Sequence, residues 1–152
     1  MSDVSLAIRY TNVGRLMFNA ARRFEEQIHA VVRRSGFPDV RLVHLTLTRN
    51  MDLEGTRLTV LADRAGITKQ AMGELVDQCQ TMGIVERRPD PTDRRARRIV
   101  FTARGRNLVQ VLTKAIGEAE ADMSATIGRR SVTSMVAALH TYLGEKEREK
   151  AV

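Results

Sequence analysis

The sequence is poor in aromatic residues and in cysteine. Aromatic residues make up 4% of the 152 residues, tryptophan is missing, and the chain has 1 cysteine. This composition predicts an aliphatic core in which the 7 methionines act as flexible fillers. A single cysteine excludes a disulfide within the chain and is typical of a protein in a reducing cytosol.

Long apolar runs and targeting signals are missing too. The sequence has no run of about 18 apolar residues, so we expect no membrane-spanning helix. The start, Met1-Ser2-Asp3, lacks the basic residues and the apolar stretch of a signal peptide. We therefore expect a cytoplasmic protein.

Patterns of catalysis and metal binding are also lacking. The 3 histidines, His29, His44 and His140, lie far apart and form no metal-binding spacing such as His-Glu-x-x-His. The sequence shows no glycine-rich phosphate loop and no nucleophile–base motif. We predict that the chain is not an enzyme and holds no cofactor and no metal.

Positive charge, by contrast, is in excess. The chain has 25 Lys and Arg against 18 Asp and Glu, a formal net charge of +7. This excess favours an anionic partner, either nucleic acid or an acidic membrane surface. A hydrophobic fraction of 43% and the length of the chain predict one globular domain with a real core.

Apolar residues at helical spacing predict helices in both outer parts of the chain. The first helix is expected from about Thr11 to Arg34. After it, Pro38 to Asn50 is ambiguous between strand and helix, and we favour a helix. Residues 52–56 are interpreted as a loop.

The second outer part is expected to begin with a long helix capped by Thr102. A break near Gly128 should be followed by a last helix capped by Ser131, and the tail EKEREK is interpreted as a solvated helix end. Broad apolar faces at both ends of a chain are typical of helices that pack across a two-fold axis, so we expect a homodimer.

The central stretch from Leu58 to Gly105 predicts a helix–turn–helix followed by a hairpin. Thr59 is expected to cap a short helix that ends at Gly66, and Thr68 to cap a second helix that runs to about Met82.

The second of these helices has one apolar and one polar side. The apolar side is predicted to contain Ile67, Met72, Leu75, Cys79 and Met82. Recognition helices place their N-terminal residues in the major groove, so we expect Thr68, Lys69 and Gln70 to contact bases. Lysine donates to guanine, and glutamine binds adenine through two hydrogen bonds. Gly73 either allows close approach to DNA or is merely tolerated, and both alternatives stay open.

The hairpin is rich in arginine. Residues 84–88 and 98–101 alternate like strands, and PDPTDRRA supplies the turn between them. The hairpin carries Arg87, Arg88, Arg94, Arg95, Arg97 and Arg98. Arginine suits narrow minor grooves and phosphates, so this hairpin is predicted to be a DNA-binding wing.

Residues 58–106 are similar to the DNA-binding lobe of the MarR family of winged-helix transcription regulators. The most specific part is Asp93, then Arg95, then Phe101-Thr102, with Gly105 opening the next helix. The family usually carries leucine where Phe101 stands, a mild departure. The resemblance implies a mainly α, winged helix-turn-helix fold with about six helices and one β-hairpin wing. It places a DNA-binding lobe at residues 39–104 and a helical dimerisation lobe at residues 1–36 and 105–148.

The resemblance also implies roles for single residues. Arg95 would enter the minor groove at the wing tip, and Asp93 would brace the wing by pairing with a nearby arginine. The predicted DNA-binding residues are Thr68, Lys69, Gln70, Gly73, Arg88, Asp93, Arg94, Arg95 and Arg97.

The family further implies a homodimer on a pseudo-palindromic operator, often a repressor that a small aromatic ligand releases. The sequence identifies neither the ligand nor its pocket; His44 is interpreted as a surface or core-edge residue, with a ligand crevice as the alternative. Some members sense oxidants through cysteine, but Cys79 lies on the buried side of its helix, where the family commonly carries leucine, so we interpret it as a core thiol. The alternative function is a winged-helix module for RNA or protein contact without operator binding. Against RNA stands the lack of an aromatic stacking platform.

Overall fold

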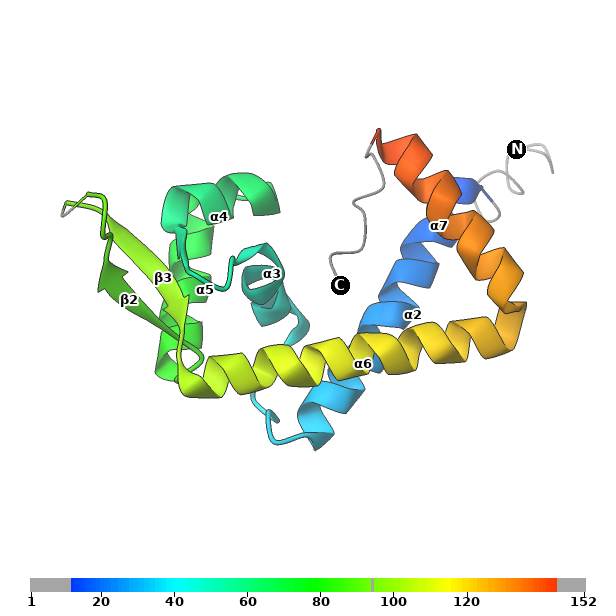
Figure 1. The fold of residues 1–152 in the computed structure, drawn as a ribbon, viewed down its shortest axis with the longest axis horizontal. Coiled ribbons are helices and arrows are strands. Elements are labelled where there is room, and N and C mark those ends of the chain that lie inside the picture. Colours follow the sequence, from blue (N-terminus) through cyan, green and yellow to red (C-terminus); the bar gives the residue numbers. More distant parts are fainter. Residues whose placement is uncertain (1–11, 94, 145–152) are drawn as a thin grey trace, which may run out of the picture. The chain divides into compact units, whose positions relative to one another are not determined.

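The computed structural model describes residues 12–93 and 95–144. These residues form six α-helices and a three-stranded antiparallel sheet (Figure 1). The predicted mainly helical, winged-helix fold is confirmed. The chain divides into two compact units, one ending at Ala115 and the other beginning at Ile116, and each is described by itself.

The helices and strands follow the order expected from the sequence, with one added strand. The helices are α2 (Val13–Arg34), α3 (Leu42–Asn50), α4 (Leu58–Ala65), α5 (Lys69–Thr81), α6 (Ala103–Ile127) and α7 (Arg129–Leu143). The strands are β1 (Thr56–Arg57), β2 (Val85–Pro89) and β3 (Arg97–Phe101).

The helix–turn–helix is formed by α4 and α5. Gly66 ends α4 in the left-handed conformation, with a φ of 64°, which glycine adopts without steric cost. Thr68 caps α5 as predicted, since its side chain accepts a hydrogen bond from the Ala71 amide at 3.1 Å. The predicted cap of α4 is wrong, because that helix already begins at Leu58 with Arg57 as its N-cap.

Strand β1 explains this earlier start and was not predicted. Thr56 and Arg57 pair with Ile99 and Arg98 of β3, so the sheet order is β1-β3-β2. Residues 52–56 are therefore not entirely loop. Two residues are too few to show the alternation by which strands are recognised in a sequence.

Two further helix starts differ from the predictions. The ambiguous stretch is helical, but only from Leu42, because Pro38 and Asp39 form a turn. Helix α7 begins at Arg129, directly after Gly128, so Ser131 lies inside the helix and does not cap it. Thr102 fulfils its predicted role: its hydroxyl oxygen accepts from the Gly105 amide at 3.0 Å and donates to carbonyl oxygens at the start of the wing.

The first unit contains the core, which is mostly aliphatic, as predicted. Its largest fully buried side chains include Val32, Leu47, Leu61, Met72, Ile84, Ile99 and Leu108. Phe37 and Phe101 are the aromatic residues of this core, and the guanidinium of Arg104 lies 4.9 Å from the ring centre of Phe37. None of the described helices is apolar over enough residues to cross a membrane.

Both units expose large apolar side chains. In the first unit, the beginning of α2 exposes Val13, Leu16, Met17 and Phe18. In the second unit, Ile116, Ile127, Val136, Tyr142 and Leu143 are exposed, and α7 contains no buried residue. These side chains need a further covering surface if they are to leave water.

Gly105 joins α6 closely to the wing, and its replacement tests this packing. A Cβ at Gly105 would overlap the Ile84 carbonyl oxygen and would lie 3.0 Å from Cδ1 of Phe101. We expect Gly105→Ala to lower the free energy of unfolding by about 1–3 kcal/mol through overpacking. Gly117→Ala in the same helix is the control, since a Cβ there meets nothing within 4 Å. It should stabilise the chain by about 0.5–1 kcal/mol through helix propensity. Urea unfolding of both variants measures the difference, and equal stabilities would contradict the close packing.

Candidate nucleic-acid interface

Helix α5 buries its apolar side and leaves its N-terminal turn exposed. Met72 and Cys79 are fully buried and Leu75 is nearly so, as predicted, while Ile67 and Met82 are only half-buried. Val76 is fully buried as well, which the sequence analysis missed. Helices α3 and α4 both contact α5. Away from the core, Lys69, Gln70 and Glu74 of α5 are exposed.

The predicted base-contacting residues lie together on this exposed turn. Thr68, Lys69 and Gln70 are all exposed. The amide nitrogen of Gln70 lies 3.4 Å from Oε1 of Glu74 one turn later, a weak contact that leaves the amide oxygen free. The positive end of the α5 dipole faces outward at the same place, which favours phosphate oxygens.

A buried histidine ties α5 to α3. The Arg41 amide donates to Nδ1 of His44 at 3.1 Å, so that nitrogen carries no proton. The other ring nitrogen then donates to Oε1 of Gln78 at 2.9 Å, and the Arg41 guanidinium donates to the same oxygen at 2.9 Å. Both ring nitrogens are thus used within the protein, and His44 is 3% exposed. This agrees with a core residue better than with a ligand crevice.

The wing is attached to α5 by Arg87. Its guanidinium pairs with Asp77 at 2.7 Å and donates to Gln80 at 2.7 Å, so β2 and α5 are held together by side chains. Arg88 forms a local pair, with Nε donating to Glu86 at 2.8 Å.

The end of the hairpin carries exposed positive charge. Arg95 and Arg97 are exposed, and no ion pair to either occurs within the described residues. Arg94, also predicted to contact DNA, lies outside them. Two unpaired guanidiniums at the end of a β-ribbon can both reach phosphates or a minor groove.

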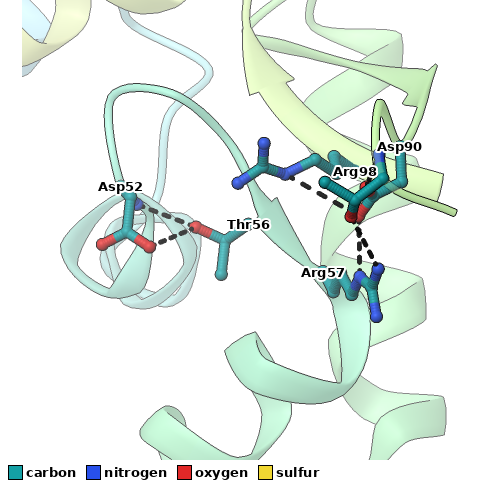
Figure 2. Close-up of polar contacts among 6 residues, drawn as sticks. Asp52, Thr56, Arg57, Asp90 and Arg98 are labelled. Atoms are coloured by element: carbon teal, nitrogen blue, oxygen red, sulfur yellow. Dashed lines mark hydrogen bonds and ion pairs between the residues drawn. The ribbon is translucent and has the colours of Figure 1, made fainter. Parts of the chain in front are cut away.

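Within the described residues, Asp90 makes an ion pair of the kind expected of Asp93. Asp93 accepts a hydrogen bond from the Arg95 amide at 3.0 Å and so organises the turn through the backbone. Asp90 is 4% exposed and accepts from Nε of Arg57 at 2.7 Å, while Nε of Arg98 lies 4.0 Å away (Figure 2). Asp93 lies within the turn, whereas Asp90 directly follows β2 and reaches across the sheet.

The surroundings of Asp90 favour its charged form. The Arg57 guanidinium, together with hydrogen bonds from Thr92, holds the pKa of the Asp90 carboxyl well below its usual range. Because the folded pKa is lowered, the resulting stabilisation is present above the ordinary aspartate pKa of about 4. It is lost only as the pH falls through the lower folded value, so the contact is complete at neutral pH.

A second acidic residue fixes the segment before β1. The Asp52 carboxylate pairs with Arg64 of α4 at 2.9 Å. It also accepts from the Thr56 hydroxyl at 3.2 Å, a contact drawn in Figure 2. The hydrogen bond and charge of Arg64 lower the pKa of Asp52.

Cys79 has the properties of a core thiol. It is fully buried, and burial raises its pKa to about 11. The thiolate is the form that reacts with oxidants, and it is scarce at neutral pH when the pKa is so high. This supports a packing role rather than redox sensing.

Arg57 and Asp90 are the functional candidates that the sequence analysis missed. Asp90 was interpreted only as part of a turn, and Arg57 stood before a helix whose start was placed too late. Their contact joins positions 33 residues apart. Neither spacing nor periodicity carries a signal for such a pair.

A model of the MarR family matches residues 49–96, which cover α4, α5, β2 and the wing turn. The predicted resemblance to the MarR family is confirmed. A search of curated protein sequences finds no match.

Solved structures agree with the MarR-family fold. Apo MarR from E. coli has a TM-score of 0.70 at 16% identity, covering 88% of this chain and 98% of its own. The transcriptional repressor CouR, bound to a 23-mer DNA duplex, has a TM-score of 0.69 at 22% identity, covering 93% and 99%. The Mycobacterium tuberculosis MarR family protein Rv2887, in complex with p-aminosalicylic acid, has a TM-score of 0.66 at 21% identity, covering 89% and 100%.

Replacement of Gly73 by alanine distinguishes a role in DNA binding from mere tolerance of the glycine. A Cβ at Gly73 meets nothing within 4 Å, so Gly73→Ala should raise the free energy of unfolding by about 0.5–1 kcal/mol. If α5 lies close to DNA at this residue, the same variant should bind DNA more weakly. Thermal unfolding and DNA titration of the one variant measure both effects. A more stable variant with unchanged affinity would show that Gly73 is merely tolerated.

Proposed function

We propose that the chain is a transcription regulator that binds double-stranded DNA sequence-specifically, as a homodimer on a pseudo-palindromic operator. The MarR-family winged-helix fold supports a DNA-binding regulator. The observation that carries the proposal is the pairing, in one compact unit, of an exposed helix N-terminus with a hairpin end bearing unpaired arginines. The helix would contact bases in the major groove and the wing would enter the minor groove.

The proposed DNA-contacting residues fall into two groups. Thr68, Lys69, Gln70 and Gly73 would face the major groove. The wing group comprises Arg88, Asp93, Arg94, Arg95 and Arg97. Asp93 would act by shaping the turn, because a carboxylate is repelled by phosphates.

A second copy of the chain would cover the exposed apolar side chains. Those of α2 and those of the second unit lie outside residues 39–104, the proposed DNA-binding lobe. Residues 1–36 and 105–148 would then form the dimerisation lobe. The duplex bound to CouR supports this proposal: 23 base pairs span about two helical turns, room for two half-sites.

Repression and release by a small aromatic ligand complete the proposal. Rv2887, whose structure is similar to this chain, was solved in complex with p-aminosalicylic acid, and this supports a ligand of that kind. Addition of p-aminosalicylic acid to the protein–operator complex is a direct first test, with release of the DNA as the expected result. Retained binding would contradict release by that compound.

Arg95→Ala tests the wing. Loss of a groove contact should weaken operator binding by about 1–3 kcal/mol, or about 5- to 150-fold, without unfolding the protein. Arg22→Ala removes the same charge from an exposed ion pair of α2, 3.7 Å from Glu26, and should change affinity little. Titration of an operator obtained by in vitro selection measures both. Unchanged affinity of Arg95→Ala would refute the wing assignment, and a structured RNA that competes as well as the operator would favour an RNA-binding module.

Gln70→Ala tests base recognition. Its loss should relax the preferred base at one position of each half-site while the rest of the selected motif persists. Gln110→Ala, an exposed glutamine of α6, is the matched control and should select the wild-type motif. In vitro selection with both variants measures this. An unaltered motif for Gln70→Ala would mean that Gln70 does not contact a base.

A further inference from the structure

Asp90 joins three parts of the DNA-binding lobe through one carboxylate. Oδ2 accepts a hydrogen bond from Nε of Arg57 and lies 4.0 Å from Nε of Arg98 in β3. Arg57 lies in β1 and is the N-cap residue of α4. Oδ1 receives the amide and the hydroxyl of Thr92 in the wing turn, at 2.8 and 2.7 Å. The start of the helix–turn–helix, the central strand and the turn therefore meet at a side chain that is 4% exposed.

This contact crosses the central strand. Strands β1 and β2 lie on opposite sides of β3, so backbone hydrogen bonds cannot join them directly. Arg57 pairs with Arg98 across one edge of β3, and Asp90 follows the other neighbour, β2. Since β1 contributes only two residues to the sheet, the Asp90–Arg57 pair adds a side-chain link where the backbone link is short (Figure 2).

Asp90 also offsets a concentration of like charge. In the sheet register, Arg98 of β3 is paired with Arg57 of β1 on one side and with Arg88 of β2 on the other. Directly paired residues point to the same face of a sheet, so the three arginines share one face. Neighbouring like charges destabilise a sheet. The Asp90 carboxylate lies against the first two of these arginines, and Glu86 pairs with the third.

The candidate wing-tip residues lie within the loop that Asp90 closes. The Asp90 amide donates to the Ala96 carbonyl oxygen at 3.1 Å, so the described residues 91–93 and 95 project beyond this hydrogen bond. Any tilt of the hairpin about the Asp90–Ala96 hydrogen bond would move Arg95 relative to the exposed first turn of α5. The contacts on Asp90 restrict that tilt.

We propose that Asp90 is the positioning residue of the wing, and that its contact with Arg57 sets where the hairpin tip stands relative to α4 and α5. This inference rests on the proposed function, because it concerns how the two DNA-contacting elements are matched to one operator. The charge of Asp90 and its proposed positioning role predict opposite effects on DNA affinity when the carboxylate is removed. Removing a carboxylate from a surface that approaches phosphates should tighten binding, whereas loss of positioning should weaken it.

The first test is Asp90→Asn, which keeps the shape of the side chain and removes its charge. We expect operator affinity to fall about 5- to 100-fold, comparable with loss of a wing contact, while affinity for unrelated DNA stays the same or rises. Glu25→Gln makes the same change of charge at an exposed ion pair, 2.9 Å from Arg49, and should leave operator affinity unchanged. Asp90→Asn binding as tightly as wild type, or more tightly, would overturn the inference.

A double-mutant cycle with Arg95→Ala distinguishes positioning from general stability. Within the described part of the chain, no hydrogen bond or ion pair joins Asp90 to Arg95, and Asp90 would act on DNA only through the position of the hairpin tip. Once Arg95 is replaced, Asp90→Asn should cost little further affinity. Additive losses would assign Asp90 a structural role alone and would overturn the inference.

A milder variant covers the case in which Asp90→Asn does not fold. Thr92→Val removes one hydroxyl donor to Asp90 and nearly preserves the side-chain shape. It should weaken operator binding severalfold, and Arg95→Ala should again remove the effect; unchanged affinity would count against the inference. Failure of the wild-type chain to select any DNA motif would overturn the proposed function itself. If the wild-type chain selects a motif and Asp90→Asn binds that motif equally well, only the inference about Asp90 is overturned.

Discussion

The burial of one side of α5 is the constraint on which the proposed DNA-binding lobe depends. Met72, Val76 and Cys79 are fully buried, and this fixes the rotation of the helix about its axis. Because the rotation is fixed, Lys69 and Gln70 face solvent with the positive end of the helix dipole. Burial of each of the Met72 and Val76 side chains stabilises the fold by roughly 1.5–3 kcal/mol, which is more than a surface ion pair contributes. The apolar side therefore decides which residues of α5 face solvent.

A second constraint is electrostatic and lies in the wing. A hairpin that carries arginines at its end and also on its sheet face must limit repulsion between them without losing the charge that attracts DNA. The structure does this by position: the acidic residues Asp77, Glu86 and Asp90 pair with arginines near the sheet. Arg95 and Arg97, further along, have no such partner within the described residues. Attraction for an anionic partner is thereby concentrated at the end of the hairpin.

The parts of the fold that the sequence predicted are those set by local chemistry. Gly66, Thr68 and Thr102 end or cap their helices as expected, because each acts on backbone groups within a few residues. Strand β1 and the contact between Arg57 and Asp90 escaped prediction because they join distant residues. Ser131 shows the opposite limit: a good capping residue lies inside α7, because Gly128, three residues earlier, is already the N-cap and the helix begins at Arg129.

Two different sets of contacts would set the geometry of one head and the spacing between two heads. The geometry of one proposed DNA-contacting head depends on contacts inside the first unit: α5 against α3 through His44 and Gln78, and the wing against α5 through Arg87. The spacing between two heads would depend instead on the apolar side chains that this unit and the second unit leave exposed. A ligand that changes the second geometry need not disturb the first, because the ion pairs and hydrogen bonds that hold the wing on its helices lie within residues 41–102. In the proposed dimer, such a division would let the two heads move while each head keeps its shape.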